Sequence, residues 1–126
     1  MNKQQQAAAI TKVTKAVFPN TTNHYDTLFG GTALNWMDEV AFITATRYSR
    51  QKMVTVSSDK IDFNKAIPAG TIVELIGTIE KVGRTSLEVL VEVYTEEMYA
   101  IKREKSISGL FTMVAIGEDK KPVSIL

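Results

Sequence analysis

Residues 32–47 constrain the fold more than any other stretch, because they predict a helix that is apolar on nearly every side. The stretch contains no proline or glycine, and helix-forming residues dominate it. At about 100° per residue, Leu34, Phe42 and Ala45 share one side of this helix, and most of the remaining circumference is also apolar. A helix of this kind is buried, so other parts of the protein have to cover it.

Five other stretches predict β-strands that can cover the helix. They are residues 10–19 before it and residues 54–67, 71–82, 84–96 and 106–117 after it. Pro68, Gly70 and Gly83 predict turns between strands, and consecutive strands with short connections form an antiparallel sheet. The sequence therefore predicts an α+β fold in which an antiparallel sheet wraps around a central buried helix.

The length of 126 residues accommodates a single domain, residues 1–126, and leaves no room for a second core. Residues 1–9 are polar and then small, which predicts a flexible terminus or a short helix. A domain of this size leaves much apolar surface exposed, so burial against a partner subunit is favoured but not required.

The charge distribution argues against a nucleic-acid-binding or membrane protein. The formal charge is +1, from 15 basic and 14 acidic residues, without the basic stripe that nucleic-acid-binding proteins carry. Lys102, Arg103 and Lys105 are interrupted by Glu104 and predict a solvated loop. The predicted helix contains acidic residues and is too short to span a bilayer.

Several kinds of catalytic site are also excluded. Without cysteine there are no disulfides, thiolate metal sites or cysteine nucleophiles, and with His24 as the single histidine we expect no metal. Neither the GxSxG motif nor a glycine-rich phosphate loop occurs. The N-terminal residues lack the apolar core of a signal peptide, so we expect a cytoplasmic protein. Any catalysis has to rest on carboxylates, amides, hydroxyls, His24 or backbone groups.

Gly30 and Gly31 precede the predicted helix and have two interpretations. The first backbone N–H groups of a helix have no partner within it and favour negative charge, so they can stabilise a developing oxyanion. Glycine lets a ligand come close to such a backbone. The alternative is that the pair only makes a tight turn into the helix.

Asp38 lies on the apolar side of the helix, where an aspartate is costly unless it is paired or useful. The alternative is an ordinary solvated carboxylate. Asp38 follows Gly30 by eight residues, roughly 12 Å along a helix axis. Since reacting atoms lie about 3 Å apart, both groups can act on one bond only if a second subunit supplies the aspartate.

Asn23 precedes Gly30 by seven residues in a polar loop. Its amide offers both a donor and an acceptor, so it can bind a carbonyl oxygen or orient a water. The alternative is a residue that only shapes a turn.

Together these residues resemble the acyl-CoA thioesterases of the hotdog superfamily, of the cytosolic acyl-CoA thioester hydrolase type. The resemblance rests first on Asn23, His24, Leu28, Phe29, Gly30, Gly31, Leu34, Trp36, Met37, Asp38, Glu39, Val40 and Ala41. It continues through Asp59, Ile61, Asp62, Phe63, Pro68, Gly70, residues 82–89, residues 111–115, Lys121, Pro122 and Val123. It covers about residues 10–126, and the spacing from Asn23 through Gly30 to Asp38 is its specific part.

The resemblance implies hydrolysis of acyl-CoA thioesters at a site shared by two subunits. It places the nucleophile or general base at Asp38, the residue that binds the thioester carbonyl or the water at Asn23, and the oxyanion hole at Gly30 with Gly31. It implies no cofactor, because coenzyme A belongs to the substrate and product. It also implies a homodimer as the catalytic unit, which in that family usually assembles further into tetramers or hexamers.

The resemblance also implies contacts to the substrate outside the reacting atoms. Phe29, Arg84, Thr85 and Ser86 are expected to contact the coenzyme A or acyl part, since Arg84 can bind a phosphate and Ser86 can donate a hydrogen bond. The alternative for residues 84–86 is a plain hairpin turn with a solvated arginine.

Two other functions remain open on the same fold. One is a hydratase or dehydratase that acts on acyl thioesters, which would need His24 as a catalyst beside an acid. The other is a non-catalytic protein that binds acyl-CoA. We expect His24 to be a structural residue or to lie at the rim of the site.

Overall fold

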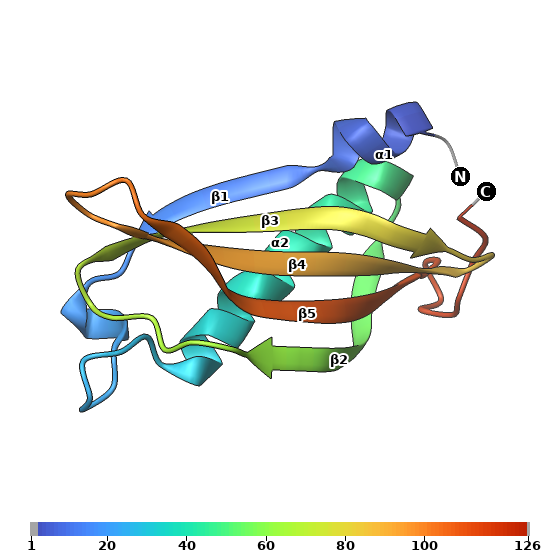
Figure 1. The fold of residues 1–126 in the computed structure, drawn as a ribbon. Coiled ribbons are helices and arrows are strands. Elements are labelled where there is room, and N and C mark those ends of the chain that lie inside the picture. Colours follow the sequence, from blue (N-terminus) through green and yellow to red (C-terminus); the bar gives the residue numbers. More distant parts are fainter. Residues whose placement is uncertain (1–2, 126) are drawn as a thin grey trace.

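The computed structural model of the protein describes residues 3–125, and its main features are one sheet and one long helix (Figure 1). The elements in chain order are α1 Lys3–Ala9, β1 Thr11–Ala16, the 3₁₀ helix η1 Pro19–Thr21, α2 Gly30–Ser49, β2 Met53–Phe63, β3 Thr71–Val82, β4 Ser86–Glu97 and β5 Arg103–Ala115. The five strands lie in the order β1-β3-β4-β5-β2, and all neighbours are antiparallel. The predicted α+β arrangement of a sheet around a long helix is confirmed.

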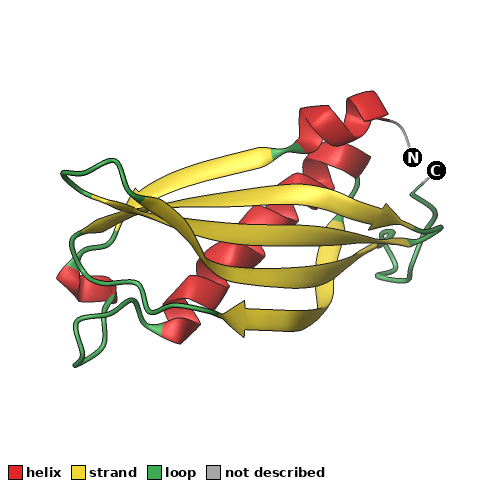
Figure 2. Ribbon diagram, in the orientation of Figure 1, coloured by secondary structure: helices red, strands yellow, loops and turns green. Residues whose placement is uncertain are grey.

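The core lies between α2 and the inner face of the sheet, which the helix crosses obliquely (Figure 2). In β3 and β4, buried residues alternate with partly exposed ones, as in a sheet with one covered face. The buried residues between the helix and the sheet include Ala33, Met37, Val40, Ala41, Ala45, Val73, Leu75, Val89, Val91, Val93 and Met113.

The sheet covers only one side of α2, so the expectation of a helix enclosed all round does not hold within a single chain. Phe42 is 46% exposed, and Asn35 and Glu39 are exposed as well. The uncovered side still carries apolar residues, which is typical of a protein–protein interface.

The helix and the second strand differ from their predicted bounds. The helix begins at Gly30, so both glycines of the pair belong to its first turn, and it ends at Ser49. Strand β2 ends at Phe63, and residues 64–67 belong to the following loop.

The predicted loop at residues 102–105 is wrong for its last three residues, because β5 begins at Arg103. The guanidinium of Arg103 donates to Glu74 at 2.7 Å, and the ammonium of Lys105 donates to Glu92 at 3.2 Å. Glu92 lies on the neighbouring strand β4, and Glu74 lies on β3, one strand farther away. Opposite charges on the same face of the sheet offset one another, so a charged stretch is compatible with a strand here.

Residues 3–9 adopt the short helix that was one of the two predicted alternatives for the N-terminal stretch. The guanidinium of Arg47 on α2 donates to the carbonyl oxygens of Ala8 at 2.6 Å and Ile10 at 2.9 Å, which ties this helix to the core. Residues 1, 2 and 126 lie outside the described residues.

Residues 3–125 bear on two expectations from the sequence, that the protein does not cross a membrane and that it binds no metal. Within them, no helix combines the length and apolar character that crossing a membrane requires. The same residues contain no group of three or more His, Cys, Asp or Glu side chains that could hold a metal ion. A cytoplasmic location and the absence of a cofactor stay predictions.

Two glycines in the sheet let α2 approach closely. A Cβ atom at Gly77 on β3 would overlap the Thr44 hydroxyl and lie 2.9 Å from the Val40 side chain. A Cβ atom at Gly109 on β5 would overlap Ile61 of β2 and lie 3.2 Å from the end of the Met37 side chain. At Gly77 the helix and the sheet therefore meet at a distance that only glycine permits, and at Gly109 the neighbouring strand takes up the space of a side chain.

We expect Gly77→Ala to lower the free energy of unfolding by about 1–3 kcal/mol, because an added methyl group has no room under the helix. The measurement is urea unfolding of the parent and the variant. Gly83→Ala is the matched control, since a Cβ atom there would meet its nearest neighbour at an ordinary 3.4 Å. Equal stability of the Gly77 variant and the parent would contradict this account of the packing.

Candidate active site

The loop before α2 folds back on itself and brings Asn23 toward the start of the helix. Thr22 and Leu28 form an antiparallel bridge, and the N–H of Phe29 donates to the carbonyl of Thr21 at 3.0 Å. The N–H of Leu28 donates to the carbonyl of Ile67 at 2.7 Å, which fixes the loop against the segment after β2. The loop is thus a small hairpin held against the rest of the protein.

Asn23 closes this hairpin with one end of its amide. Its Oδ1 accepts hydrogen bonds from the N–H of Tyr25 at 2.9 Å, the N–H of Thr27 at 3.2 Å and the hydroxyl of Thr27 at 3.1 Å. Its Nδ2 group has no hydrogen-bond partner among residues 3–125. The turn interpretation therefore accounts for the oxygen and leaves two N–H groups for another acceptor.

The first turn of α2 offers backbone donors to a ligand. Phe29 is the N-cap residue and provides no side-chain hydrogen bond, so the side chain does not satisfy the N–H groups of Gly30 and Gly31. Gly30 is partly exposed and Gly31 is exposed. The rings of Phe29 and Phe63 lie close to these glycines and are themselves half exposed. This terminus can stabilise a negatively charged oxygen.

A cavity of about 310 Å³ opens beside this first turn. It is lined by Thr27, Leu28, Gly30, Ala33, Phe63, Lys65, Ala66, Ile67 and Ile107. The lining is mostly apolar, and the volume lies at the lower end of the range of ligand sites. Gly30 belongs both to the cavity wall and to the donor turn, so a group bound to its N–H can extend into the cavity.

Asp38 lies farther along α2, partly buried, and is held by the second strand. The hydroxyl of Thr55 on β2 donates to Oδ1 of Asp38 at 2.7 Å and also lies 3.3 Å from the sulfur of Met113. Asp38 is thus a paired carboxylate that accepts a hydrogen bond within the protein. The two residues connect the middle of the helix to the edge strand.

Thr55 did not emerge from the sequence as a candidate site residue. Its only signal is a hydroxyl within the apolar run Met53, Val54, Val56, which many exposed strands share. The contact with Asp38 joins residues 17 positions apart and depends on how β2 packs beside the helix.

One chain does not bring all predicted site residues together. Arg84 and Thr85 lie in the connection between β3 and β4, and Ser86 begins β4, at the opposite end of the sheet from the start of α2 (Figure 1). In this chain the backbone of the connection serves structure, because the carbonyls of Arg84 and Thr85 accept hydrogen bonds from Ile125 and Ala115. His24 is exposed and lies against the ring of Tyr25 with 3.9 Å between centroids.

Known proteins resemble the chain in both sequence and structure. A family model for the thioesterase superfamily matches residues 25–102. An uncharacterized acyl-CoA thioester hydrolase of Bacillus subtilis is 38% identical over 112 residues, which are 89% of this chain and 65% of that protein. The chain thus spans less than two thirds of the length of this relative.

Solved structures match over nearly the whole chain. An acyl-CoA hydrolase from Staphylococcus aureus in complex with butyryl coenzyme A and coenzyme A superposes with a TM-score of 0.90 at 32% identity, covering 94% of this chain and 73% of that one. A hexameric acyl-CoA thioesterase in its apo form gives a TM-score of 0.91 at 36% identity, covering 94% and 76%.

The Staphylococcus enzyme has also been solved as three variants in which alanine replaces an aspartate, an asparagine or a threonine. The match of the family model over more than half of the chain, together with the shared architecture, establishes the family. The chain belongs to the thioesterase superfamily and has its hotdog fold.

Proposed function

We propose that this protein hydrolyses acyl-CoA thioesters to a carboxylic acid and coenzyme A, with Asp38 as the catalytic carboxylate. The observation that supports this most is the hydrogen bond between Thr55 and Asp38. The aspartate, asparagine and threonine replaced in the Staphylococcus aureus hydrolase have the same spacings along that chain as Asp38, Asn23 and Thr55 have here. Chance does not readily produce two matching spacings among residues that the structure independently singles out.

The proposed chemistry uses Asp38, Asn23 and the first turn of α2. The carbonyl oxygen of the thioester accepts hydrogen bonds from the N–H of Gly30 or Gly31 and from Nδ2 of Asn23. Asp38 takes a proton from a water that attacks the carbonyl carbon, or attacks that carbon itself. The negative charge collects on the carbonyl oxygen, the carbon–sulfur bond breaks, and the coenzyme A thiolate leaves and is protonated.

A second protomer is needed to bring these groups together. The carboxylate of Asp38 and the N–H of Gly30 are separated by about 12 Å along one helix, far more than the reach of a single reacting group. The helix is uncovered on one side in the single chain, where Phe42 is 46% exposed. We infer that the partner's helix lies antiparallel on this side.

Strand β2 is the edge that can join the two protomers. It lies at one end of the sheet order, and residues 54–60 are all exposed, including Val56 at 56%. A long edge strand with exposed apolar residues readily pairs with another strand. Antiparallel pairing of β2 with its copy would make one continuous sheet with a twofold axis between the two copies.

The same twofold axis explains why residues 84–86 lie far from Gly30 in one chain. It would turn the partner's connection between β3 and β4 toward the end of the sheet where α2 begins. Arg84 of the partner subunit could then bind a phosphate of a coenzyme A whose thioester lies at Gly30. Further assembly of such dimers is supported by the hexameric structural neighbour.

The hydratase alternative has less support. It requires His24 to act with an acid, whereas the solved structures that match the chain are an acyl-CoA hydrolase and an acyl-CoA thioesterase.

We expect Asp38→Asn to lower kcat for butyryl-CoA by a factor of about a hundred or more, because the amide can neither accept the proton nor attack. Thiol release in a coupled colorimetric assay measures the rate. Glu80→Gln removes an exposed carboxylate on β3, away from α2, and serves as the control, which should keep the parental rate. A folded Asp38 variant with full turnover would refute the role assigned to this residue.

Thr55 is proposed as a positioning residue that orients the Asp38 carboxylate. Thr55→Val keeps the shape and removes the hydroxyl, and we expect kcat to fall about tenfold or more with little change in KM, since a hydrogen bond to a charged group is lost. Thr55→Ser restores a hydroxyl and should recover most of kcat. If the valine and serine variants behave alike, the hydrogen bond has no part in turnover.

Mixing two inactive variants tests whether the site is shared between protomers. Asn23→Asp keeps the oxygen that closes the loop and removes the Nδ2 donor, so it can be paired with Asp38→Asn. In a mixed dimer, one of the two shared sites then carries neither substitution, and random pairing should restore about a quarter of the parental activity. Co-expressed variants whose activity does not exceed the average of the two separate variants would place both residues in one protomer.

A further inference from the structure

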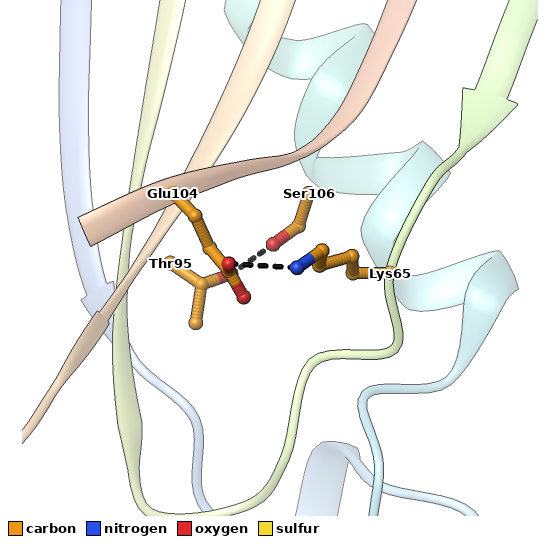
Figure 3. Close-up of polar contacts among 4 residues, drawn as sticks. All are labelled: Lys65, Thr95, Glu104 and Ser106. Carbon is orange, nitrogen blue, oxygen red and sulfur yellow. Dashed lines mark hydrogen bonds and ion pairs between the residues drawn. The ribbon is translucent and has the colours of Figure 1, made fainter. Parts of the chain in front are cut away.

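Two cavities lie on either side of an ion pair near the end of the sheet where α2 begins. Lys65 lines the cavity of about 310 Å³ that contains Gly30. Glu104 lines a second cavity of about 120 Å³, together with Pro68, Thr71, Thr95, Glu97 and Lys102. The ammonium of Lys65 donates to Oε2 of Glu104 at 2.9 Å (Figure 3). This ion pair therefore joins a residue that lines one cavity to a residue that lines the other.

The backbone near this ion pair is firmly held. The N–H groups of Asn64 and Lys65 donate to the carbonyl of Ser106 on β5 at 2.9 and 3.2 Å. The hydroxyls of Ser106 and Thr95 share a buried hydrogen bond of 2.7 Å that ties β5 to β4 (Figure 3). The backbone of the segment that carries Lys65 is therefore anchored to β5.

The surroundings of Glu104 favour its charged form. The hydrogen bond from Lys65 lowers the pKa of Glu104 below its ordinary value, and the positive charges of Lys65 and Lys102 act in the same direction. Lys65 and Glu104 remain 56% and 41% exposed, so the protein does not depend on this pair to fold.

The larger cavity runs from the donor turn of α2 toward this pair. A thioester carbonyl bound at Gly30 would direct its acyl chain among Leu28, Ala33, Ile67 and Ile107. Burial of an apolar chain among these side chains makes the free energy of binding more favourable. Binding becomes less favourable when the end of the chain displaces water from an ammonium or a carboxylate.

We propose that the Lys65–Glu104 ion pair is the end wall of the acyl cavity and sets the longest acyl chain that the enzyme uses well. This proposal rests on the proposed acyl-CoA hydrolysis and adds a specificity-determining residue to it. For chains that stop short of the pair, kcat/KM rises with every added methylene group. Chains that reach it have to push two paired charges apart before they can enter the second cavity.

The test is a series of straight-chain acyl-CoA substrates from acetyl to palmitoyl, assayed with the parent and with Lys65→Ala. In the parent, kcat/KM should rise about fourfold per methylene group and then level off or fall. In Lys65→Ala the break should move to longer chains, so the ratio of kcat/KM for long and short substrates rises at least tenfold. Glu104→Ala should move the break in the same direction, because Lys65 loses the partner that holds it across the opening.

Lys105→Ala is the matched control, because it breaks a similar lysine–glutamate pair with Glu92 away from both cavities. Its chain-length profile should equal that of the parent. A second measurement avoids turnover: non-hydrolysable alkyl-CoA thioethers of increasing length are bound to Asp38→Asn with and without Lys65→Ala, and Kd is measured by calorimetry. The Kd series should break at the same chain lengths as the kinetic series.

The outcomes separate this inference from the proposed function. If the parent hydrolyses acyl-CoA and the profiles of Lys65→Ala and the parent coincide, the wall is overturned and the hydrolase stands. If the parent hydrolyses no acyl-CoA in the series, both the proposed function and the proposed role of the Lys65–Glu104 pair are overturned. A longer-chain break in Lys65→Ala but not in Lys105→Ala supports both.

Discussion

The close packing of α2 against the inner face of the sheet is the constraint on which the rest of the structure depends. At Gly77 the helix approaches β3 at a distance that excludes a side chain. This approach fixes the depth and the direction of the helix. It therefore fixes where its first turn opens to solvent and which strand meets its middle. Asp38 meets Thr55 because β2, the last strand in the sheet order, passes beside the helix at that height.

The same packing leaves the protomer incomplete. A sheet of five strands covers one side of α2, and the edge strand β2 and the side of the helix near Phe42 stay exposed. Apolar surface along an unpaired edge favours association, and a twofold pairing would bring one protomer's carboxylate to the other's donor turn. In this proposal association and catalysis have one cause: the surface that drives dimer formation is the surface that carries half of each site.

The cavity beside the first turn connects the proposed chemistry with substrate choice. Its wall near Gly30 offers backbone donors, its middle is apolar, and its far boundary is an ion pair between segments that are remote in sequence. Such a boundary can be altered without disturbing the core, because both charged side chains are about half exposed and the backbone at Lys65 is held by Ser106. Chain-length preference could therefore change while the helix, the sheet and the reacting groups stay as they are.

The sequence by itself determined the class of fold and the long helix, because periodicity is a local property that a single chain displays. It offered Asn23, Gly30 and Asp38 as candidate groups through their resemblance to hotdog thioesterases, and their roles stay predictions. It also indicated that Asp38 and Gly30 are too far apart to act on one bond within one protomer. Only the tertiary structure decided the contact of Thr55 with Asp38, the strand at Arg103, the uncovered side of α2 and the pairing of Lys65 with Glu104. Each of these depends on which strands become neighbours in the sheet, and that is settled by packing between residues far apart in the chain. No local pattern around Thr55 or Lys65 carries this information.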